Sequence, residues 1–279
     1  MKTLKLGLIG HPVKHSLSPW IHHQFMKQAG IEGEYHLYSI EPEVFEEKIS
    51  KLLESGINGF NITVPYKQRI IPFLDELDPD AEKIGAVNTA VYKNGKWIGY
   101  NTDGAGYVRA LKQVLPADNS MSRVLVLGAG GAARGIYRAL VTEGFPYVDI
   151  SNRTREKAEQ LLQLQEPETV TGILTFAEAE KQIKDYDIII QTTSVGMSPG
   201  DKEQIVSLSG LKPNTVVSDI VYKPIETKLL QSAKEQGAVI HHGHSMLLYQ
   251  AQYAFEIWSG KQLIIGDLLD RLEQKVTEA

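Results

Sequence analysis

The sequence lacks cysteine entirely, and this absence excludes two classes of protein. Without thiols the chain cannot be a disulfide-built secreted scaffold, nor can it hold a cysteine-ligated zinc or iron–sulfur centre. It also lacks any apolar run of about 18 residues or more, the length that a transmembrane helix needs. The short apolar stretch at its start is interrupted by Gly7, Gly10 and Pro12. No small-residue cleavage site follows it, so we expect a first strand there and not a signal peptide.

An excess of basic residues is missing as well. The chain has 29 Lys and Arg against 34 Asp and Glu, a formal net charge of −5. A general nucleic-acid binder needs a clustered cationic face, so we expect no nucleic-acid partner. With 279 residues, 42% of them hydrophobic, the chain can bury one large or two ordinary cores. We expect a soluble, cytoplasmic α/β protein without a membrane partner.

Short apolar runs alternate with segments of helical spacing along almost the whole chain, which is typical of a parallel α/β protein. The apolar runs predict strands at 4–9, 59–64, 124–127, 147–150, 187–193, 216–221 and 238–240. The helical spacing predicts helices from Ser18-Pro19 onward (with Ser18 as N-cap), over 43–55, near 107–115, up to about 143, near 155–165, over 226–236, and from Ser245 onward with a break at Ser259-Gly260. Asn94-Gly95 predicts a type I′ hairpin within 86–101, so the first sheet should be mixed. The pattern indicates two domains with a boundary near 102–122, which includes a loop over 116–122.

The segment RVLVLGAGGAARG, residues 123–135, joins an expected strand to an expected helix through Gly128-x-Gly130-x-x-Ala133. The first glycine permits a tight turn, the second lets a pyrophosphate approach the backbone, and the small third residue lets helix and strand pack closely. This context predicts a Rossmann domain. Its candidate cofactor-binding residues in the turn are Gly128, Ala129, Gly130, Gly131 and Ala132.

The end of the next expected strand indicates which dinucleotide is bound. An NAD site usually places an acidic residue there for the ribose 2′-hydroxyl, but Asp149 lies within the strand. The ribose position holds Asn152, Arg153 and Thr154, and Lys157 follows one turn later. A guanidinium can bind a 2′-phosphate with two hydrogen bonds, so we predict NADP(H). The alternative is a solvated basic helix start.

Four polar clusters interrupt the apolar pattern of the first domain, at 11–19, 61–67, 85–89 and 99–104. We expect each at the C-terminal end of a strand, where open α/β sheets bind ligands. Ser16 and Ser18 could hold a carboxylate, although Ser18 could also only cap its helix. Lys67 could be solvated, and Asp103 could cap the helix after it.

Taken together, the strings GHPVKHSLSP, NITVPYK, GAVNT, GYNTDGAG, GAGGAARG, NRT, TTSVGM, VYKPIET and GHSMLLYQ show a resemblance. In order and spacing, from residue 10 to 250, the chain resembles the shikimate dehydrogenase family. The resemblance implies reversible NADPH-dependent reduction of 3-dehydroshikimate to shikimate in aromatic biosynthesis. The chain departs from the family pattern at His23, Lys223, His244 and Ser245, none of which touches the implied acid–base pair.

The resemblance also implies which residues do what. Lys67 would donate the proton to the carbonyl oxygen and take it back in reverse, with Asp103 holding the ammonium group. Substrate would be bound by Ser16, Ser18 and Tyr222 at the carboxylate, and by Thr63, Lys67, Asn88, Asp103 and Gln250 at the ring. Cofactor would be bound by the glycine-rich turn, by Asn152, Arg153, Thr154 and Lys157, and near the nicotinamide by Thr192, Ile220, Gly243 and Met246.

The implied fold is two α/β domains. Residues 1–103, completed by C-terminal helices 245–279, form a substrate domain with a mostly parallel mixed sheet. Residues 104–244 form a Rossmann NADP domain with a doubly wound parallel sheet. The implied assembly is a monomer or a homodimer.

Three other functions remain open from the sequence. One is a quinate/shikimate dehydrogenase that uses NAD, against which Arg153 argues. Another is a tetrahydrofolate-linked dehydrogenase, although Ser16 and Ser18 suit a small carboxylic acid better. The third is a non-catalytic NADP(H)-binding regulatory module, which has no need of Lys67. A metal site at His241, His242 and His244 lacks carboxylate support, so we expect none.

Overall fold

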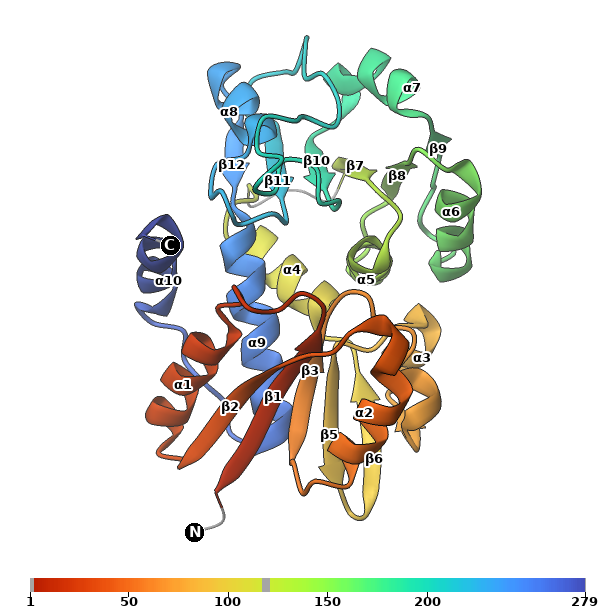
Figure 1. Ribbon diagram of the computed structural model, residues 1–279. Coiled ribbons are helices and arrows are strands. Elements are labelled where there is room, and N and C mark those ends of the chain that lie inside the picture. Colours follow the sequence, from red (N-terminus) through yellow and green to blue (C-terminus); the bar gives the residue numbers. More distant parts are fainter. Residues whose placement is uncertain (1–2, 117–120, 279) are drawn as a thin grey trace. The chain divides into compact units, whose positions relative to one another are not determined.

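The computed structural model describes residues 3–116 and 121–278, so part of the expected loop at 116–122 lies outside the described residues. Contacts divide the chain into two compact units (Figure 1). The first unit comprises Met1–Thr102 and Gln250–Ile265, and the second comprises Asp103–Tyr249 and Gly266–Ala279. The described residues include no helix long and apolar enough to cross a membrane.

A six-stranded sheet in the order β2-β1-β3-β5-β6-β4 is the centre of the first unit. Its strands are β1 (Leu4–Gly10), β2 (Gly33–Ser39), β3 (Gly59–Ile62), β4 (Glu76–Leu77), β5 (Thr89–Lys93) and β6 (Lys96–Tyr100). Strand β1 pairs in parallel with β2 and β3, and β4 pairs in parallel with β6. Strand β5 is antiparallel to both β3 and β6. The predicted mixed, mostly parallel sheet is therefore confirmed.

The turn between β5 and β6 forms as the sequence predicts. Asn94 and Gly95 have φ values of 54° and 80°, the left-handed pair that a type I′ turn requires. The turn sets the register Lys93↔Lys96 and brings Thr89 opposite Tyr100 at the other end of the hairpin.

Helices cover both faces of this sheet: α1 (Ser18–Ala29), α2 (Phe45–Leu53), α3 (Pro79–Ile84) and the second half of α9 (Gly243–Ser259), with 3₁₀ turns η1 (Pro42–Val44) and η2 (Ile71–Phe73). Helices α2 and α3 lie on one face, and α1 and α9 on the other (Figure 1). The expectation that Ser18 caps α1 is wrong. Leu17 is the N-cap and Ser18 the first helical residue, because its hydroxyl is engaged with Ser16 instead.

The second half of α9 belongs to the core of the first unit. Nε1 of Trp258 donates a hydrogen bond of 2.9 Å to the carbonyl oxygen of Ala90. A Cβ atom on Gly59 would lie 2.3 Å from the same Nε1, so strand β3 needs a glycine where the indole crosses it. The side chain of Lys261 bonds the carbonyl oxygen of Ala29 beyond the end of the helix.

The second unit contains a fully parallel six-stranded sheet in the order β12-β11-β10-β7-β8-β9. Its strands are β7 (Arg123–Leu127), β8 (Tyr147–Ser151), β9 (Ile173–Leu174), β10 (Ile188–Gln191), β11 (Val216–Asp219) and β12 (Val239–His241). Counted from β7, this is the doubly wound order 3-2-1-4-5-6 of a Rossmann fold, as predicted.

The helices of the second unit are α4 (Asp103–Leu111), α5 (Gly131–Thr142), α6 (Arg155–Glu159), α7 (Phe176–Lys181), α8 (Lys228–Glu235), the first turns of α9, and α10 (Leu268–Glu278), with 3₁₀ turns η3 (Gln160–Leu164) and η4 (Ile183–Asp185). The family resemblance predicts that all of 245–279 belongs to the first domain. Contacts group only Gln250–Ile265 with it and place α10 with the second unit.

Close packing of α4 on α5 gives a stability prediction. A Cβ atom on Gly104 would lie 2.2 Å from the carbonyl oxygen of Gly135 and 2.9 Å from Cβ of Ala139. We expect Gly104→Ala to lower the free energy of unfolding by about 1–3 kcal/mol, because overpacking forces the helices apart. Urea denaturation measures this. The control is Gly130→Ala, whose added methyl group meets no atom within 4 Å, and equal stability of the two variants would contradict the prediction.

Candidate functional site

The four polar clusters of the first unit meet at one edge of its sheet. Strands β1, β3 and β6 end there at Gly10, Ile62 and Tyr100. The expectation that every cluster follows a strand is wrong for 85–89, which precedes β5. Because β5 is antiparallel to β3, with Asn61 opposite Thr89, the start of β5 lies at the same edge as the ends of the other strands.

The two serines expected to hold a carboxylate lie together at the start of α1. The Oγ atom of Ser16 donates to Oγ of Ser18 at 3.1 Å, and the backbone N–H of Ser18 donates to Oγ of Ser16 at 3.2 Å. Ser18 is buried, whereas Ser16 is partly exposed. The pair therefore places two hydroxyl groups at the sheet edge, at the start of α1.

Asn88 is held in one orientation by its neighbours. Its Oδ1 accepts hydrogen bonds from the hydroxyl of Thr89 (2.9 Å) and from the backbone N–H of Thr102 (2.8 Å). Its Nδ2 donates to Oγ1 of Thr102 (2.9 Å) and to Oε1 of Gln250 (3.5 Å). The structure thus brings Asn88 and Gln250 together, with the amide nitrogen of Asn88 on the side of Gln250.

Lys67 and Thr63 lie in the loop after β3. Lys67 is half-buried, and its carbonyl oxygen accepts the backbone N–H of Val87 at 2.7 Å, which joins this loop to the 85–89 cluster. The backbone N–H of Thr63 donates to the carbonyl oxygen of Ile9 at 2.9 Å. The loops that carry Thr63, Lys67 and Asn88 are therefore linked through the backbone.

Two of the predicted substrate-binding residues, Asp103 and Tyr222, belong to the second unit. Asp103 is the first residue of α4, and only 5% of its surface is exposed. In the chain it follows Thr102, whose backbone N–H bonds Asn88. Tyr222 follows β11 and is partly buried, and burial raises the pKa of its phenol.

The glycine-rich turn of the second unit has the geometry of a diphosphate site. Gly128 has a φ of 116°, and a Cβ atom there would lie 2.5 Å from Oγ1 of Thr192, so the turn requires glycine. At Gly130 an added Cβ atom would meet nothing within 4 Å, so no protein atom requires glycine there. Gly130 is also the N-cap of α5, without a side-chain cap bond. Open space beside helix N–H groups that no side chain caps fits a bound diphosphate.

Asp149 is buried in the sheet, and its carboxylate is bonded by other groups of the protein. Its Oδ1 accepts the backbone N–H of Gly172 at 2.7 Å. Its Oδ2 accepts from the hydroxyl of Tyr186 at 2.8 Å and from the guanidinium of Arg123 at 3.2 Å. The buried acid therefore stabilises the sheet.

The segment after β8 presents exposed basic groups instead. Nδ2 of Asn152 bonds the carbonyl oxygen of Thr154 at 2.7 Å and shapes the loop. Arg153 and Lys157 are exposed, and neither forms an ion pair within residues 3–116 and 121–278. Neighbouring Arg155, in contrast, pairs with Glu159 at 2.9 Å.

A buried chain of hydrogen bonds holds the junction of β12 and α9. Tyr107 donates to Oγ of Ser218, which lies 2.8 Å from Nδ1 of His241. Nε2 of His241 lies 2.9 Å from Oγ of Ser245, and Ser245 donates to the carbonyl oxygen of His242.

This junction sets the position of the residues predicted near the nicotinamide. A Cβ atom on Gly243 would lie 2.4 Å from the carbonyl oxygen of Ile220, so β11 and α9 approach as closely as glycine allows. Thr192 bonds the carbonyl oxygen of Leu127 through its hydroxyl at 2.8 Å. Met246 is buried in the core of the unit.

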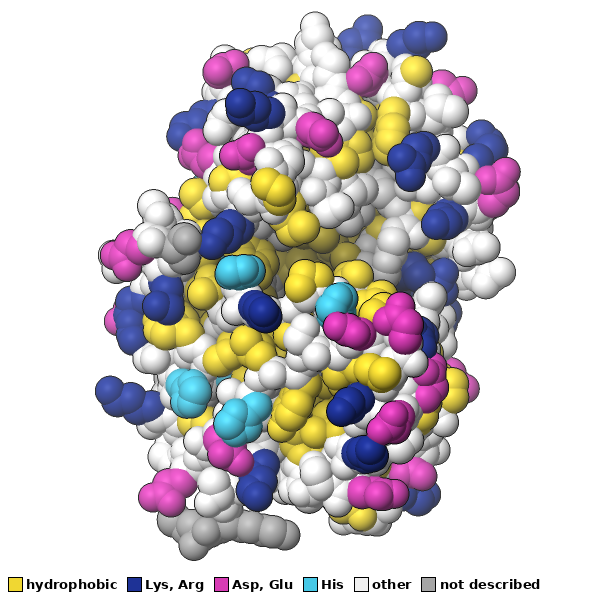
Figure 2. Space-filling model, in the orientation of Figure 1, with side chains coloured by type: hydrophobic (Ala, Val, Ile, Leu, Met, Phe, Trp, Pro, Cys, Tyr) yellow, Lys and Arg dark blue, Asp and Glu magenta, His cyan; other side chains and the backbone are white. Residues whose placement is uncertain are grey.

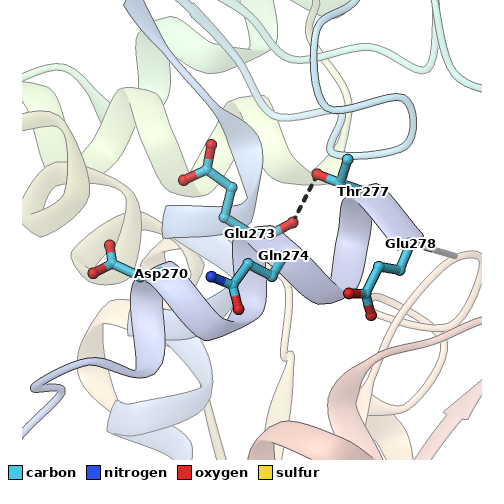
Figure 3. Close-up of a pocket in the computed structure, with 5 residues that line it drawn as sticks. All are labelled: Asp270, Glu273, Gln274, Thr277 and Glu278. Atoms are coloured by element: carbon cyan, nitrogen blue, oxygen red, sulfur yellow. Dashed lines mark hydrogen bonds between the residues drawn. The ribbon is translucent and has the colours of Figure 1, made fainter.

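Other surface features of the described residues give weaker evidence for a functional site. No group of three or more His, Asp or Glu side chains among the described residues is arranged to hold a metal ion. A shallow pocket is lined by Asp270, Glu273, Gln274, Thr277 and Glu278, all on α10 (Figure 3). It contains none of the predicted site residues. On the face drawn in Figure 2, basic and acidic side chains are interspersed and not gathered by sign.

Sequence reasoning missed one buried polar cluster of the first unit. His22, Tyr35 and Asn61 form hydrogen bonds and a ring stack in the core of the first unit. The sequence does contain one signal of a buried polar group, because Asn61 interrupts an apolar strand. Its partners on α1 and β2 are 39 and 26 residues away, and no local pattern identifies them.

Comparison with known proteins agrees with this geometry. A family model described as shikimate dehydrogenase substrate binding domain matches residues 8–90, and one described as shikimate/quinate 5-dehydrogenase matches residues 110–231. A shikimate dehydrogenase (NADP(+)) of Oceanobacillus iheyensis is 48% identical over 275 residues, covering 98% of each chain.

Two solved structures are similar over their whole length. A shikimate dehydrogenase in complex with NADP+ has a TM-score of 0.91 and 38% identity, covering 99% of this chain and 96% of that one. The enzyme from Thermus thermophilus, in complex with NADP(H) and shikimate, has a TM-score of 0.87 and 29% identity, covering 98% and 100%.

A Rossmann sheet with a diphosphate-binding turn, joined to a second α/β unit with a lysine at a polar sheet edge, defines the class of two-domain dinucleotide-dependent dehydrogenases. Matches to both family models and the full-length identity then identify the family. The chain belongs to the shikimate dehydrogenase family.

The buried histidines give a prediction for stability against pH. Burial lowers the pKa of His22 to about 3 and that of His241 to about 4, from 6.5. The unfolded chain therefore takes up protons first as pH falls, and stability that is complete above pH 6.5 is lost toward pH 4. Burial raises the pKa of Asp219 to about 6, which opposes this trend below pH 6, but a single acid does not cancel two histidines.

Replacing one histidine isolates its contribution to the pH dependence of the free energy of unfolding. Between pH 7.5 and pH 5, the free energy of unfolding of His241→Gln should fall by about 2 kcal/mol less than that of the unaltered protein. Urea denaturation at the two pH values measures the difference. The control is His36→Gln, a change at an exposed histidine on β2. The same pH dependence in both variants would show that His241 is not held neutral by burial.

Proposed function

We propose that this chain catalyses the reversible NADPH-dependent reduction of 3-dehydroshikimate to shikimate. The carrying observation is the edge of the first sheet. There the Ser16–Ser18 hydroxyl pair follows β1, the half-buried Lys67 follows β3, and Asn88 precedes β5 and bonds Gln250 of α9. A carboxylate, ring hydroxyls and a carbonyl on one small ring match hydroxyl donors, amides and an ammonium group. The family's named activity supports the same substrate.

Lys67 is the proposed proton donor. Negative charge develops on the carbonyl oxygen as the carbonyl carbon is reduced, and an ammonium group there stabilises it and supplies the proton. In the reverse direction the amine accepts the hydroxyl proton. Asp103 is proposed to hold this ammonium group in place. Thr63, Asn88 and Gln250 are proposed to bind the ring, and Ser16, Ser18 and Tyr222 the carboxylate.

The second unit is proposed to bind NADPH, which supplies a hydride when bound. The turn from Gly128 to Ala132 would hold the diphosphate, and Asn152, Arg153, Thr154 and Lys157 would hold the 2′-phosphate end. Thr192, Ile220, Gly243 and Met246 would border the nicotinamide. Arg153 and Lys157 are exposed and form no ion pair with any residue in the described ranges 3–116 and 121–278, which supports NADP(H) over NAD.

One assay separates this proposal from its alternatives. NADP+ reduction is followed with shikimate as substrate and quinate as control, and then with NAD+ in place of NADP+. We expect turnover with shikimate and NADP+. Preference for NAD+ or quinate would favour the quinate/shikimate alternative, and cofactor binding without turnover would favour a regulatory module. Competitive binding of a folate would favour the tetrahydrofolate-linked alternative. Cytoplasmic location and a monomeric or homodimeric state stay predictions.

Removal of the proposed acid tests the mechanism. Lys67→Ala should lower kcat by about 10²–10⁴-fold with little change in KM for shikimate, because the proton is transferred only in the transition state. Steady-state kinetics measure both constants. The control, Lys48→Ala, removes an exposed lysine from α2 of the same unit. A near-normal kcat for Lys67→Ala would refute the acid–base role.

Arg153 and Arg155, both in the segment after β8, form a matched pair for testing the proposed contact with the 2′-phosphate. Arg153→Ala should weaken NADP+ binding by about 1.5–3 kcal/mol, the value of a lost charge-assisted contact, and leave NAD+ binding nearly unchanged. Arg155→Ala, which removes a guanidinium paired with Glu159, should affect neither. Binding is measured by fluorescence titration. Equal losses for the two cofactors in Arg153→Ala would show that this residue does not contact the 2′-phosphate.

A further inference from the structure

A buried hydrogen-bonded chain in the second unit has no part in the proposed reaction, yet it joins four elements of that unit. The hydroxyl of Tyr107 on α4 donates to Oγ of Ser218 on β11 at 2.8 Å, and this Oγ lies 2.8 Å from Nδ1 of His241 on β12. Nε2 of His241 lies 2.9 Å from Oγ of Ser245 on α9. None of these four residues exposes more than 7% of its surface.

The direction of each bond in this chain follows from its two ends. The hydroxyl of Ser245 donates to the carbonyl oxygen of His242 at 2.7 Å, so toward His241 it can only accept. His241 therefore carries a proton on Nε2. Burial lowers the pKa of His241 to about 4, so the ring is neutral and its Nδ1 is an acceptor. Ser218 donates to this Nδ1, and its oxygen accepts from Tyr107.

His241 is thereby a fixed donor toward α9 and a fixed acceptor toward β11. In the other tautomer its Nε2 would face the Ser245 oxygen as a second acceptor. The chain would then contain one hydrogen bond fewer, at a cost of about 1–3 kcal/mol, because its groups are buried away from water. The rings of Tyr107 and His241 also pack edge to face, with centroids 5.8 Å apart and planes 77° apart. Bonding and packing together hold the imidazole in one orientation.

The bond from His241 to Ser245 sets the direction in which α9 leaves the sheet, because only one residue separates the end of β12 from the start of α9. That direction has little tolerance. A Cβ atom on Gly243, the first residue of α9, would lie 2.4 Å from the carbonyl oxygen of Ile220. Met246 follows Ser245 and packs in the same core as Ile220. Three of the four residues proposed to border the nicotinamide therefore lie at this junction.

We propose that His241 is a positioning residue for hydride transfer, which holds the first turn of α9 at the nicotinamide border through its bond to Ser245. The inference rests on the proposed function, because that function includes the nicotinamide border. Ser218 supports His241 from the opposite side of the ring, and Tyr107 supports Ser218.

The same chain reaches the helix that carries the acid proposed to hold Lys67. Tyr107 lies one turn after Asp103 on α4, and its hydroxyl anchors that helix to Ser218 of β11. One network in the second unit thus holds the first turns of both α4 and α9. Displacement of a reacting group by about 1 Å can cost about a hundredfold in rate, so we expect this network to affect hydride transfer more than binding.

Ser245→Ala removes the acceptor of the His241 bond and tests the proposal. We expect the single-turnover rate of hydride transfer from shikimate to NADP+, followed by stopped-flow absorbance, to fall about three- to tenfold. KM for NADP+ should stay within about twofold, because the glycine-rich turn and Arg153 are unaltered. The control is Ser232→Ala, which removes a partly buried hydroxyl that bonds Gln204 at 2.8 Å in the same unit and should leave the rate unchanged.

Three replacements of His241 separate its two bonds. His241→Gln keeps an N–H group near the position of Nε2, His241→Asn keeps an acceptor near that of Nδ1, and His241→Leu keeps neither. We expect His241→Leu and His241→Asn to slow hydride transfer about as much as Ser245→Ala, and His241→Gln to stay near the unaltered rate. Because His241 acts on α9 through Ser245, His241→Leu should add nothing in the Ser245→Ala background. Thermal denaturation verifies folding, and if His241→Leu is not folded, the Gln and Asn variants decide.

Nuclear magnetic resonance of the protein without cofactor gives a readout that does not depend on turnover. With isotope-labelled histidine, the spectrum distinguishes a protonated from an unprotonated ring nitrogen, and the signals missing from His241→Gln assign the residue. We expect a neutral ring with its proton on Nε2, and faster exchange of that proton with solvent in Ser245→Ala. A proton on Nδ1 in the unaltered protein would overturn the inference.

The kinetic outcomes separate the inference from the function on which it rests. Absence of shikimate turnover in the unaltered enzyme would overturn the proposed function, whichever nitrogen of His241 carries the proton. Normal turnover, with equal rates of hydride transfer in Ser245→Ala and Ser232→Ala, would overturn this inference alone. Additive effects of His241→Leu and Ser245→Ala would contradict it as well.

Discussion

The buried amide of Asn61 sets the geometry of the first unit. Oxygen and nitrogen are both fully bonded, to α1 and β2 on one side and to the start of β5 on the other. Leaving a buried amide group without a partner costs about 1–3 kcal/mol, so these elements cannot shift in register without a penalty. Since Ser18 and Asn88 are attached to the same elements, Asn61 couples the carboxylate end of the proposed substrate site to its ring end.

Asp149 has the corresponding place in the second unit. Its three hydrogen bonds hold β8 to β7, to the segment before β9, and to the segment before β10. A buried carboxylate whose three hydrogen bonds lie inside the sheet is committed to the fold, which leaves the strand end to Asn152 and Arg153. The preference for a phosphorylated ribose therefore depends as much on where the acid is buried as on where the arginine is exposed.

Features determined by neighbouring residues could be predicted from the sequence. The Asn94-Gly95 turn, the Gly128 turn and the strand–helix alternation are of this kind, because φ preferences and periodicity act over a few residues. Features that depend on distant partners could not. Strand β2 was missed, the start of β5 was taken for a strand end, and Ser18 was expected to cap a helix that Leu17 begins. In each case the deciding bond joins separate elements or depends on which strand pairs with which.

The proposed carboxylate site shows why such distant bonds matter for function. Ser18 is the first residue of α1, and Nε2 of His22 on the same helix lies 3.2 Å from Oδ1 of the buried Asn61. A binding group whose position is fixed in advance loses less conformational freedom when its ligand binds. In this fold, the core contacts that hold α1 in place therefore also position the two serines at its start.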